Sequence, residues 1–196
     1  ERKPKPMIAH TPWPAEAIWQ QLYPLLPDFT VEVLPHVDSS NSELMRRARD
    51  GQREATLLVA ERQSAGRGRM GRVWQSQPGD SLTFSIGLPL SPRDWSGLSL
   101  AVGLSLAESL HPDVGLKWPN DLWFQERKLG GILVEAASMG GHSQVVVGVG
   151  LNIQAPSAEG LSTPAAGLCE LLPGLTAPAC LGLVVTPLVQ ALLAFE

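Results

Sequence analysis

The stretch best suited to chemistry is residues 60–74, which reads AERQSAGRGRMGRVW. Within it, residues 66–72 bring together three glycines and three arginines: Gly66, Gly68, Gly71, Arg67, Arg69 and Arg72. Glycine permits positive φ and a close approach of the backbone to a ligand. Arginine carries a permanent charge on a planar group whose paired donors fit phosphate and carboxylate. Because no apolar periodicity runs through the stretch, we expect a loop, and its composition indicates that it binds an anionic small molecule.

The segment from Gly66 to Gly71 satisfies the G-x-G-x-x-G pattern of dinucleotide-binding sites. In those sites the glycines open a helix, and an acidic residue follows about twenty positions later. Here a strand is predicted after the glycines, and Asp94 lies in a loop, so the context argues against a dinucleotide site. The chain also contains no Walker A motif and no G-x-S-x-G nucleophile elbow.

A lysine stands out in residues 116–122, which read LKWPNDL. Lys117 ends a predicted strand just before a turn, and a lysine in that place is often a solvated charge at a sheet edge. The same position would also suit a fixed point charge on a phosphate or carboxylate. The residues alone leave both interpretations open.

Two later stretches carry glycines inside predicted strands. Residues 128–135 (KLGGILVE) begin a strand with Gly130 and Gly131, which permit close approach of a ligand. Residues 148–153 (GVGLNI) place glycines at alternate positions and leave one strand face without side chains. This face is either a slot for a flat ligand, with Asn152 at its end, or a way to relieve crowding in a bent sheet.

A polar turn precedes the loop at residues 38–43, which read DSSNSE. Ser40 followed three residues later by Glu43 fits a capping box at the start of a helix. Ser39, Ser40 and Asn41 could only cap this helix, or they could also offer hydrogen bonds to a ligand at its N-terminus.

Periodicity and turn signals predict the elements that must position these residues. Strands are expected at 30–36, 56–61, 81–88, 114–118, 122–124, 131–137 and 144–151, and the turn at 139–141 (MGG) joins the last two as a hairpin. Helices are expected at 14–26, 41–50, 92–110 and from Pro178 to the end. This order predicts an α+β fold, a mixed or antiparallel sheet with helices packed on one side.

Composition limits the class of protein. One domain is expected for 196 residues, and a net charge of -4 argues against a dedicated nucleic-acid binder. No stretch reaches the roughly 18 apolar residues of a membrane span, and the N-terminus lacks the apolar region of a secretory signal. Cys169, Cys180 and the four histidines show no metal-ligand spacing, and the cysteines fit a cytosolic protein.

Five of these stretches occur in the order found in biotin protein ligases, so the sequence from about residue 30 to 153 resembles that family. They are residues 38–41 (DSSN), 66–72 (GRGRMGR) with Trp74, 117–121 (KWPND), 128–135 (KLGGILVE) and 148–152 (GVGLN). The resemblance implies the class II aminoacyl-tRNA-synthetase-like α+β fold shared with lipoate ligases. Residues 30–196 would form the catalytic domain, and residues 1–29 an N-terminal extension with a short helix.

The resemblance implies a reaction in two steps and a role for each motif. Biotin and ATP give biotinyl-5′-adenylate and pyrophosphate, and the biotin then passes to a lysine of a carrier protein. Catalytic roles fall to Lys117, Arg67 and Arg69. Biotin-binding roles fall to Ser39, Ser40, Asn41, Gln63, Gly66, Lys117, Gly130, Gly131, Gly148 and Gly150. ATP and adenylate roles fall to Arg67, Gly68, Arg69, Arg72, Trp74, Asn120 and Asn152. Mg²⁺ would arrive with ATP, and no metal ligand is assigned. The glycine–arginine loop would order over the adenylate, so residues 64–73 are expected to be mobile without ligand.

The resemblance also implies the partners. The expected acceptor is the biotin carboxyl carrier domain of acetyl-CoA carboxylase, in the cytoplasm, with neither nucleic acid nor membrane as a partner. Repressors of the family carry an N-terminal helix-turn-helix domain, for which about thirty residues are too few, so no DNA-binding role is expected. Most members also carry a small C-terminal β domain, which is not expected within these 196 residues, and the chain is either a natural short form or a fragment. Sheet-to-sheet dimers occur in the family, and the sequence leaves the oligomeric state open.

Two alternatives remain at this point. One is a lipoate or octanoyl transferase of the same fold, which does not usually combine GRGRxGR with KWPND. The other is a binding module for biotin or a nucleotide that has lost the chemistry, against which the presence of both Lys117 and Arg69 argues.

Overall fold

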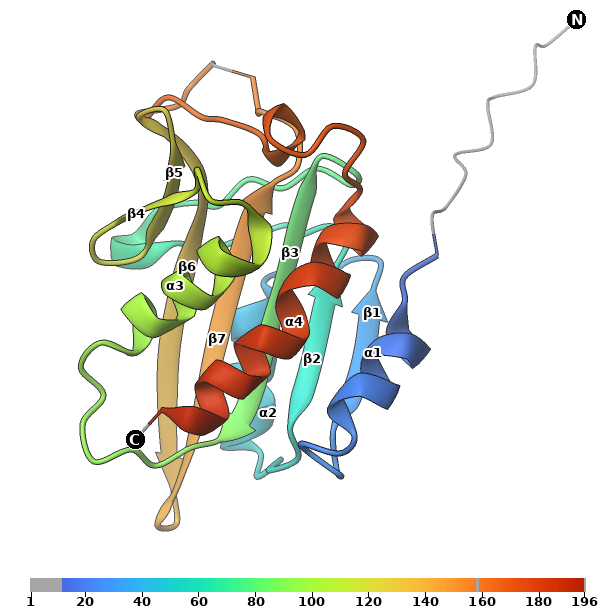
Figure 1. Ribbon diagram of the computed structural model, residues 1–196. Helices are drawn as coiled ribbons and strands as arrows, with labels where there is room; N and C mark the ends of the chain where they lie inside the picture. Colours follow the sequence, from blue (N-terminus) through green and yellow to red (C-terminus); the bar gives the residue numbers. More distant parts are fainter. Residues whose placement is uncertain (1–11, 158, 196) are drawn as a thin grey trace, which may run out of the picture.

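A seven-stranded sheet organises the chain (Figure 1). The computed structural model describes residues 12–157 and 159–195. The strands lie in the order β1-β2-β3-β7-β6-β5-β4, with β1 parallel to β2 and every other neighbouring pair antiparallel. Their bounds are Thr30–Leu34 (β1), Thr56–Ala60 (β2), Ser81–Pro89 (β3), Gly115–Lys117 (β4), Asp121–Phe124 (β5), Arg127–Met139 (β6) and His142–Asn152 (β7). The sheet is mixed, as the sequence predicts.

Alternation along β3 and β7 gives the sheet two chemically different faces, because successive side chains of a strand point to opposite sides. One set of positions is apolar and lies in the main core: Leu82, Phe84, Ile86, Leu88, Val145, Val147, Val149 and Leu151. Most intervening positions carry small or polar residues, among them Thr83, Ser85, Gly148, Gly150 and Asn152, whereas Val146 is apolar. One face therefore builds the core, and the other is left for polar chemistry.

Three helices cover the apolar face, and a fourth lies on the other (Figure 1). The three are α1 (Ala15–Leu22), α3 (Leu98–Leu110) and α4 (Ala177–Ala194), and all contribute to the main core. Helix α2 (Ser40–Arg49) instead packs Leu44 and Met45 against Leu58 and Val146 in a separate small cluster. The predicted α+β fold is confirmed. The prediction that the helices pack on one side of the sheet is wrong for α2.

Helix α2 begins one residue earlier than the capping-box pattern predicts. Its N-cap is Ser39, whose backbone is extended and whose hydroxyl accepts a hydrogen bond from the Ser42 backbone N–H at 3.3 Å. Ser40 is already helical. The Glu43 carboxylate binds two arginines of the same helix, so a capping box centred on Ser40 does not form.

Glycines set two other element boundaries. Helix α3 begins at Leu98 and not near Pro92, because Gly97 immediately before it has a φ of 82° and cannot continue a helix. The hairpin turn between β6 and β7 is confirmed, with positive φ at both Gly140 and Gly141. Two short 3₁₀ turns, Arg69–Gly71 and Leu168–Glu170, complete the described elements.

Helix α4 corrects the expectation that no stretch is long enough to span a membrane. It has 18 residues and an apolar composition, and by these two criteria alone it could cross a bilayer. In the fold it lies across the sheet, and Val184, Leu188 and Leu192 are each at most 1% exposed within the main core. Thr186 also donates a hydrogen bond to Gln21 of α1 at 2.9 Å. These contacts are those of a core helix.

A pair of leucines on α4 tests this packing. Leu188→Ala should lower the free energy of unfolding by about 2–5 kcal/mol, because it removes a fully buried side chain and leaves a cavity. Leu183→Ala, at a position that is 44% exposed, should change it by less than about 1 kcal/mol. Urea denaturation of both variants measures the difference. Equal losses would show that α4 does not bury the face assigned to it.

Candidate active site

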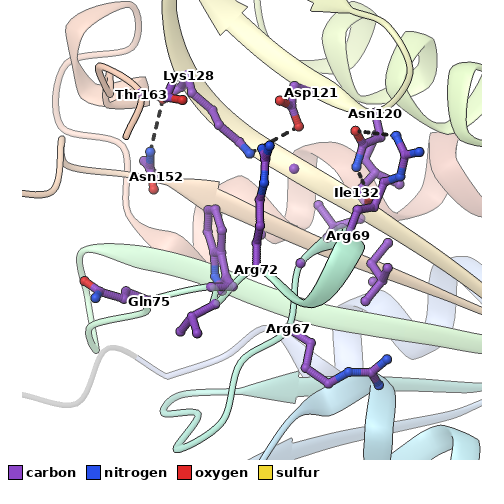
Figure 2. A pocket seen from close by; sticks show the side chains of 18 of the residues that line it. Arg67, Arg69, Arg72, Gln75, Asn120, Asp121, Lys128, Ile132, Asn152 and Thr163 are labelled. Atoms are coloured by element: carbon purple, nitrogen blue, oxygen red, sulfur yellow. Dashed lines mark hydrogen bonds and ion pairs between the residues drawn. The ribbon is translucent and has the colours of Figure 1, made fainter. Parts of the chain in front are cut away.

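A cavity of about 870 Å³ lies on the polar face of the sheet. It is lined by the turn before α2, the glycine–arginine loop, strands β3 to β7 and the segment between β7 and α4. Five cationic side chains reach it: Arg67, Arg69, Arg72, Lys117 and Lys128. The sequence motifs thus converge on one space, as Figure 2 shows for those it labels.

A buried asparagine in the first helical turn of α2 fixes the start of this helix, and the turn before it, to the sheet. Asn41 is 3% exposed and donates hydrogen bonds to the Leu133 carbonyl and the Glu135 carboxylate, each at 3.1 Å. Its carbonyl oxygen accepts from Ser85 at 2.6 Å. The Gln63 side chain accepts from the Ser40 backbone N–H at 2.7 Å and so ties the loop to the same turn. The polar atoms of Asn41 are therefore used within the protein.

The same turn is stabilised by an ion pair at its outer end. Asp38 accepts two hydrogen bonds from the Arg46 guanidinium, each at 2.8 Å, and one from the Ser39 backbone N–H at 2.7 Å. The hydrogen bonds from Arg46 lower the pKa of Asp38 to about 2. Asp38 is therefore ionised near neutral pH and helps to hold Ser39 in the extended conformation that an N-cap requires.

The glycines of β7 receive side chains of the protein. A Cβ at Gly148 would overlap the Asn41 carboxamide, and one at Gly150 would overlap the Trp74 indole. In this structure the Asn41 and Trp74 side chains therefore occupy the space directly over the two glycines, where the sequence leaves room for a flat ligand. The alternative interpretation is that the glycines relieve crowding. They do so here by leaving room for two side chains of the protein itself.

Gly66 and Gly130, assigned to biotin binding from the resemblance, do not line the cavity. A Cβ on Gly130 would meet the Gly150 carbonyl of β7, and one on Gly66 would meet the Trp74 carbonyl. Both glycines thus permit two backbone segments to approach closely. Their contribution to the site is indirect, through the positions of β7 and Trp74.

Two cations of the site are neutralised by carboxylates. Arg67 forms a bidentate pair with Glu135, at 2.9 and 3.2 Å, and donates to the Ser42 hydroxyl at 3.0 Å. The Lys128 ammonium lies 3.2 Å from the Asp121 carboxylate. In Figure 2, Arg67 points away from the other labelled arginines. Each of these two charges is largely compensated within the protein.

Two other cations are held by neutral groups. Arg69 donates to the Asn120 side-chain oxygen at 3.2 Å, and Asn120 in turn donates to the Ile132 carbonyl at 2.7 Å. The Lys117 ammonium lies over the Trp123 ring, 4.1 Å from its centroid. Neither partner carries a negative charge, so these cations keep their full charge for an anion. Arg72 extends from the loop toward Lys128 and Asp121 (Figure 2).

The far end of the cavity is formed by Trp74 and Asn152. The Trp74 indole N–H donates to Thr83 at 3.3 Å. The Asn152 amide nitrogen donates to the carbonyls of Lys128 and Ala166, each at 3.2 Å. These two bonds use both amide protons and attach the segment after β7 to the start of β6, so the Asn152 side-chain oxygen is left as the atom for a ligand.

The structure gathers most of the predicted site residues, with Gly66 and Gly130 as the exceptions. Other residues that line the cavity received no role from the sequence, among them these four: Thr83, Asp121, Trp123 and Lys128. Three of them lie within or next to recognised motifs. Their importance depends on cross-strand pairing, which sequence spacing alone does not show.

Residues 34–152 match the biotin/lipoate A/B protein ligase family. The chain is 43% identical over 131 residues to the bifunctional ligase/repressor BirA of Escherichia coli, covering 63% of this chain and 40% of that protein. It is 37% identical over 172 residues to the biotin–[acetyl-CoA-carboxylase] ligase of Mycobacterium tuberculosis, covering 82% of this chain and 58% of that protein. The chain thus spans about half the length of these relatives.

A solved structure of a biotin protein ligase has a similar fold. The biotin protein ligase of Aquifex aeolicus, in complex with biotin and ATP, superposes with a TM-score of 0.67 at 35% identity. The match covers 83% of this chain and 69% of the other. The similarity therefore extends beyond the separate motifs to the arrangement of the sheet.

Two strand glycines test the close backbone approach at Gly130. Gly130→Ala should lower the free energy of unfolding by about 1–3 kcal/mol, because its Cβ would meet the Gly150 carbonyl, which cannot rotate away. Gly115→Ala is the matched control, since the nearest atom to its Cβ is 3.7 Å away, and it should change stability by less than about 1 kcal/mol. Urea midpoints measure both. A neutral Gly130→Ala would mean that β6 and β7 are not this close.

Proposed function

The chain belongs to the biotin/lipoate A/B protein ligase family, and we propose that it uses ATP to activate biotin as biotinyl-5′-AMP and transfers the activated biotin to a protein lysine. The observation that carries this proposal is the pair of cations held by neutral partners, Lys117 and Arg69, in one cavity with the loop. The proposal is supported by relatives named as biotin ligases and by the neighbouring structure described with biotin and ATP.

The first step must bring two anions together. A carboxylate oxygen of biotin attacks the α-phosphorus of ATP, the bond to the β-phosphate oxygen breaks, and pyrophosphate leaves. Cations that are fixed in place beforehand stabilise the charge of this transition state, and such stabilisation often contributes more to enzymatic catalysis than any other effect. Lys117 would sit between carboxylate and α-phosphate, and Arg69 would bind the phosphate from the loop side.

Biotin would occupy the part of the cavity beside the turn before α2. The Ser39 hydroxyl accepts a hydrogen bond within the protein and keeps a proton that can be donated. This proton suits the carbonyl oxygen of a cyclic urea. The neighbouring Ser40 hydroxyl shares a hydrogen bond with the Ser85 hydroxyl at 2.7 Å. Asn41 would shape this pocket without binding biotin through its amide, because the polar atoms of its side chain are already paired. Gln63 and Gly131 would complete the walls.

The adenosine would lie toward Trp74 and Asn152. Adenine can stack on the face of the Trp74 indole. The Asn152 side-chain oxygen, which remains as an acceptor, suits the exocyclic amino group of adenine and disfavours the oxygen that guanine has at that position. The loop would then cover the adenylate and limit its hydrolysis by water.

In the second step a lysine amine of the acceptor attacks the biotinyl carbonyl, AMP leaves, and the amine loses a proton. We propose a biotin carboxyl carrier domain as the acceptor, and the cytoplasm as the place of reaction. A homodimer stays a prediction. Within the described residues, no group of three His, Cys, Asp or Glu side chains could hold a metal ion. Mg²⁺ would therefore enter on the phosphates of ATP.

Biotin-dependent exchange of pyrophosphate into ATP tests the proposal. The wild type should exchange with biotin, and Lys117→Ala should lose at least about 100-fold, because the charge between the two anions is gone. Arg53→Ala, an exposed cation outside the cavity, should match the wild type. Exchange with lipoate alone would reassign the substrate, and biotin binding without any exchange would leave only a binding module.

Retention of the adenylate tests the role of the loop. Arg69→Ala should keep biotin affinity within a few-fold of the wild type but release biotinyl-5′-AMP at least about tenfold faster, because a charge-assisted contact to the phosphate is lost. Isotopically labelled adenylate followed by gel filtration or rapid dilution measures the release. Arg93→Ala, an exposed arginine outside the cavity, is the control. Unchanged retention in Arg69→Ala would exclude a clamp at this residue.

A further inference from the structure

Strands β4 and β5 place Lys117, Asp121 and Trp123 on the cavity side. Their side chains do not pair as the strand register alone would suggest. In their antiparallel register Lys117 lies directly opposite Asp121, and Gly115 lies opposite Trp123. Opposite charges at directly opposed positions commonly form an ion pair. Here Asp121 pairs with Lys128 of β6 at 3.2 Å, and Lys117 instead lies over the Trp123 ring.

The register explains how Lys117 reaches the ring. Trp123 is the diagonal neighbour of Lys117 across the strand pair, a separation that a long side chain and an aromatic ring can bridge. Gly115, directly opposite Trp123, adds no side chain that would compete for the space over the ring. Leu116 and Leu122 alternate to the other side of the strands, where Leu122 lies in the main core.

The group that holds the Lys117 ammonium decides how much of its positive charge remains available to an anion. A carboxylate would fix Lys117 but cancel its charge and repel an incoming phosphate or carboxylate. An aromatic face attracts a cation through its quadrupole and adds no net negative charge. Lys117 is exposed on a short edge strand and has four rotatable side-chain bonds, so without a partner its ammonium would sample many positions.

We propose that Trp123 is a positioning residue that holds the Lys117 ammonium over its ring in a charged and uncompensated state, while Lys128 keeps Asp121 from neutralising it. The inference rests on the proposed role of Lys117 in adenylate formation. It assigns functions to Trp123 and to the Asp121–Lys128 pair, which the sequence motifs leave unexplained.

The Trp123 indole N–H is buried and has no hydrogen-bond partner within the described residues. The ring is therefore used for its face and not for its N–H. Phenylalanine should replace it well, since it keeps an aromatic face and loses a donor that makes no bond. This distinction provides a conservative variant.

The main test compares Trp123→Leu with Trp123→Phe in biotin-dependent pyrophosphate exchange. Trp123→Leu should lower kcat about 3- to 30-fold, the range that corresponds to one cation–π contact. Its KM for biotin should stay within about twofold, because biotin binding to the serine turn is not changed. Trp123→Phe should recover most of kcat. Trp19→Leu, at an exposed tryptophan of α1, controls for the general loss of an indole.

A double-mutant comparison separates positioning from packing. Added to Lys117→Ala, Trp123→Leu should have no further effect on the residual exchange, whereas a general structural defect would lower it again. Full activity of Trp123→Leu, or an equal loss in Trp123→Phe, would overturn the inference for Trp123. The proposed function would still stand if Lys117→Ala alone abolished exchange, and it would fail if the wild type showed none.

The diversion of Asp121 is tested at its partner. Lys128→Met frees Asp121 beside Lys117 and should lower kcat several-fold. Asp121→Asn in the same chain should restore activity to within about threefold of the wild type, because the competing charge is gone. A double variant as slow as Lys128→Met would show that Lys128 acts on the substrate itself, and would overturn this part of the inference.

Discussion

Mutual repulsion among five cations is the constraint on which this site depends. Arg67, Arg69, Arg72, Lys117 and Lys128 line one cavity of about 870 Å³, and like charges at such close quarters destabilise one another. Carboxylates compensate Arg67 and Lys128, whereas Arg69 and Lys117 are held by an amide oxygen and an indole ring. The two compensated pairs are part of the cavity wall. The cations with neutral partners remain available for an anion.

Close packing over glycine brings these groups together. Asn41 lies over Gly148 and joins α2 to β3 and β6, and Trp74 lies over Gly150 and attaches the end of the loop to the sheet. Glu135 accepts hydrogen bonds from both Asn41 and Arg67. The start of α2, where we place biotin, is therefore joined through one carboxylate to the loop that would cover the adenylate. Order at one of these places would favour order at the other.

The sequence predicts what depends on local patterns. Periodicity and turn signals predict the strands, paired glycines predict the hairpin at residues 139–141, and the ordered motifs predict the family and most of the cavity wall. What it misses depends on contacts between distant residues. The side chains that fill the space over Gly148 and Gly150 come from elsewhere in the chain. The pairing of β6 with β7 decides that Gly130 faces the Gly150 backbone and not the cavity. Tertiary contacts likewise decide on which face of the sheet α2 packs and that Asp121 pairs with Lys128.

Partner charge, in our interpretation, sorts the cations of the cavity into structural and anion-binding groups. A crystal structure with a non-hydrolysable analogue of biotinyl-5′-AMP would show this sorting directly. We expect the phosphate, or the group that replaces it, within ion-pair distance of Lys117 and Arg69, with the Arg67–Glu135 and Lys128–Asp121 pairs intact. A phosphate bound instead by Arg67 or Lys128, with its carboxylate partner displaced and Lys117 turned away, would contradict this interpretation.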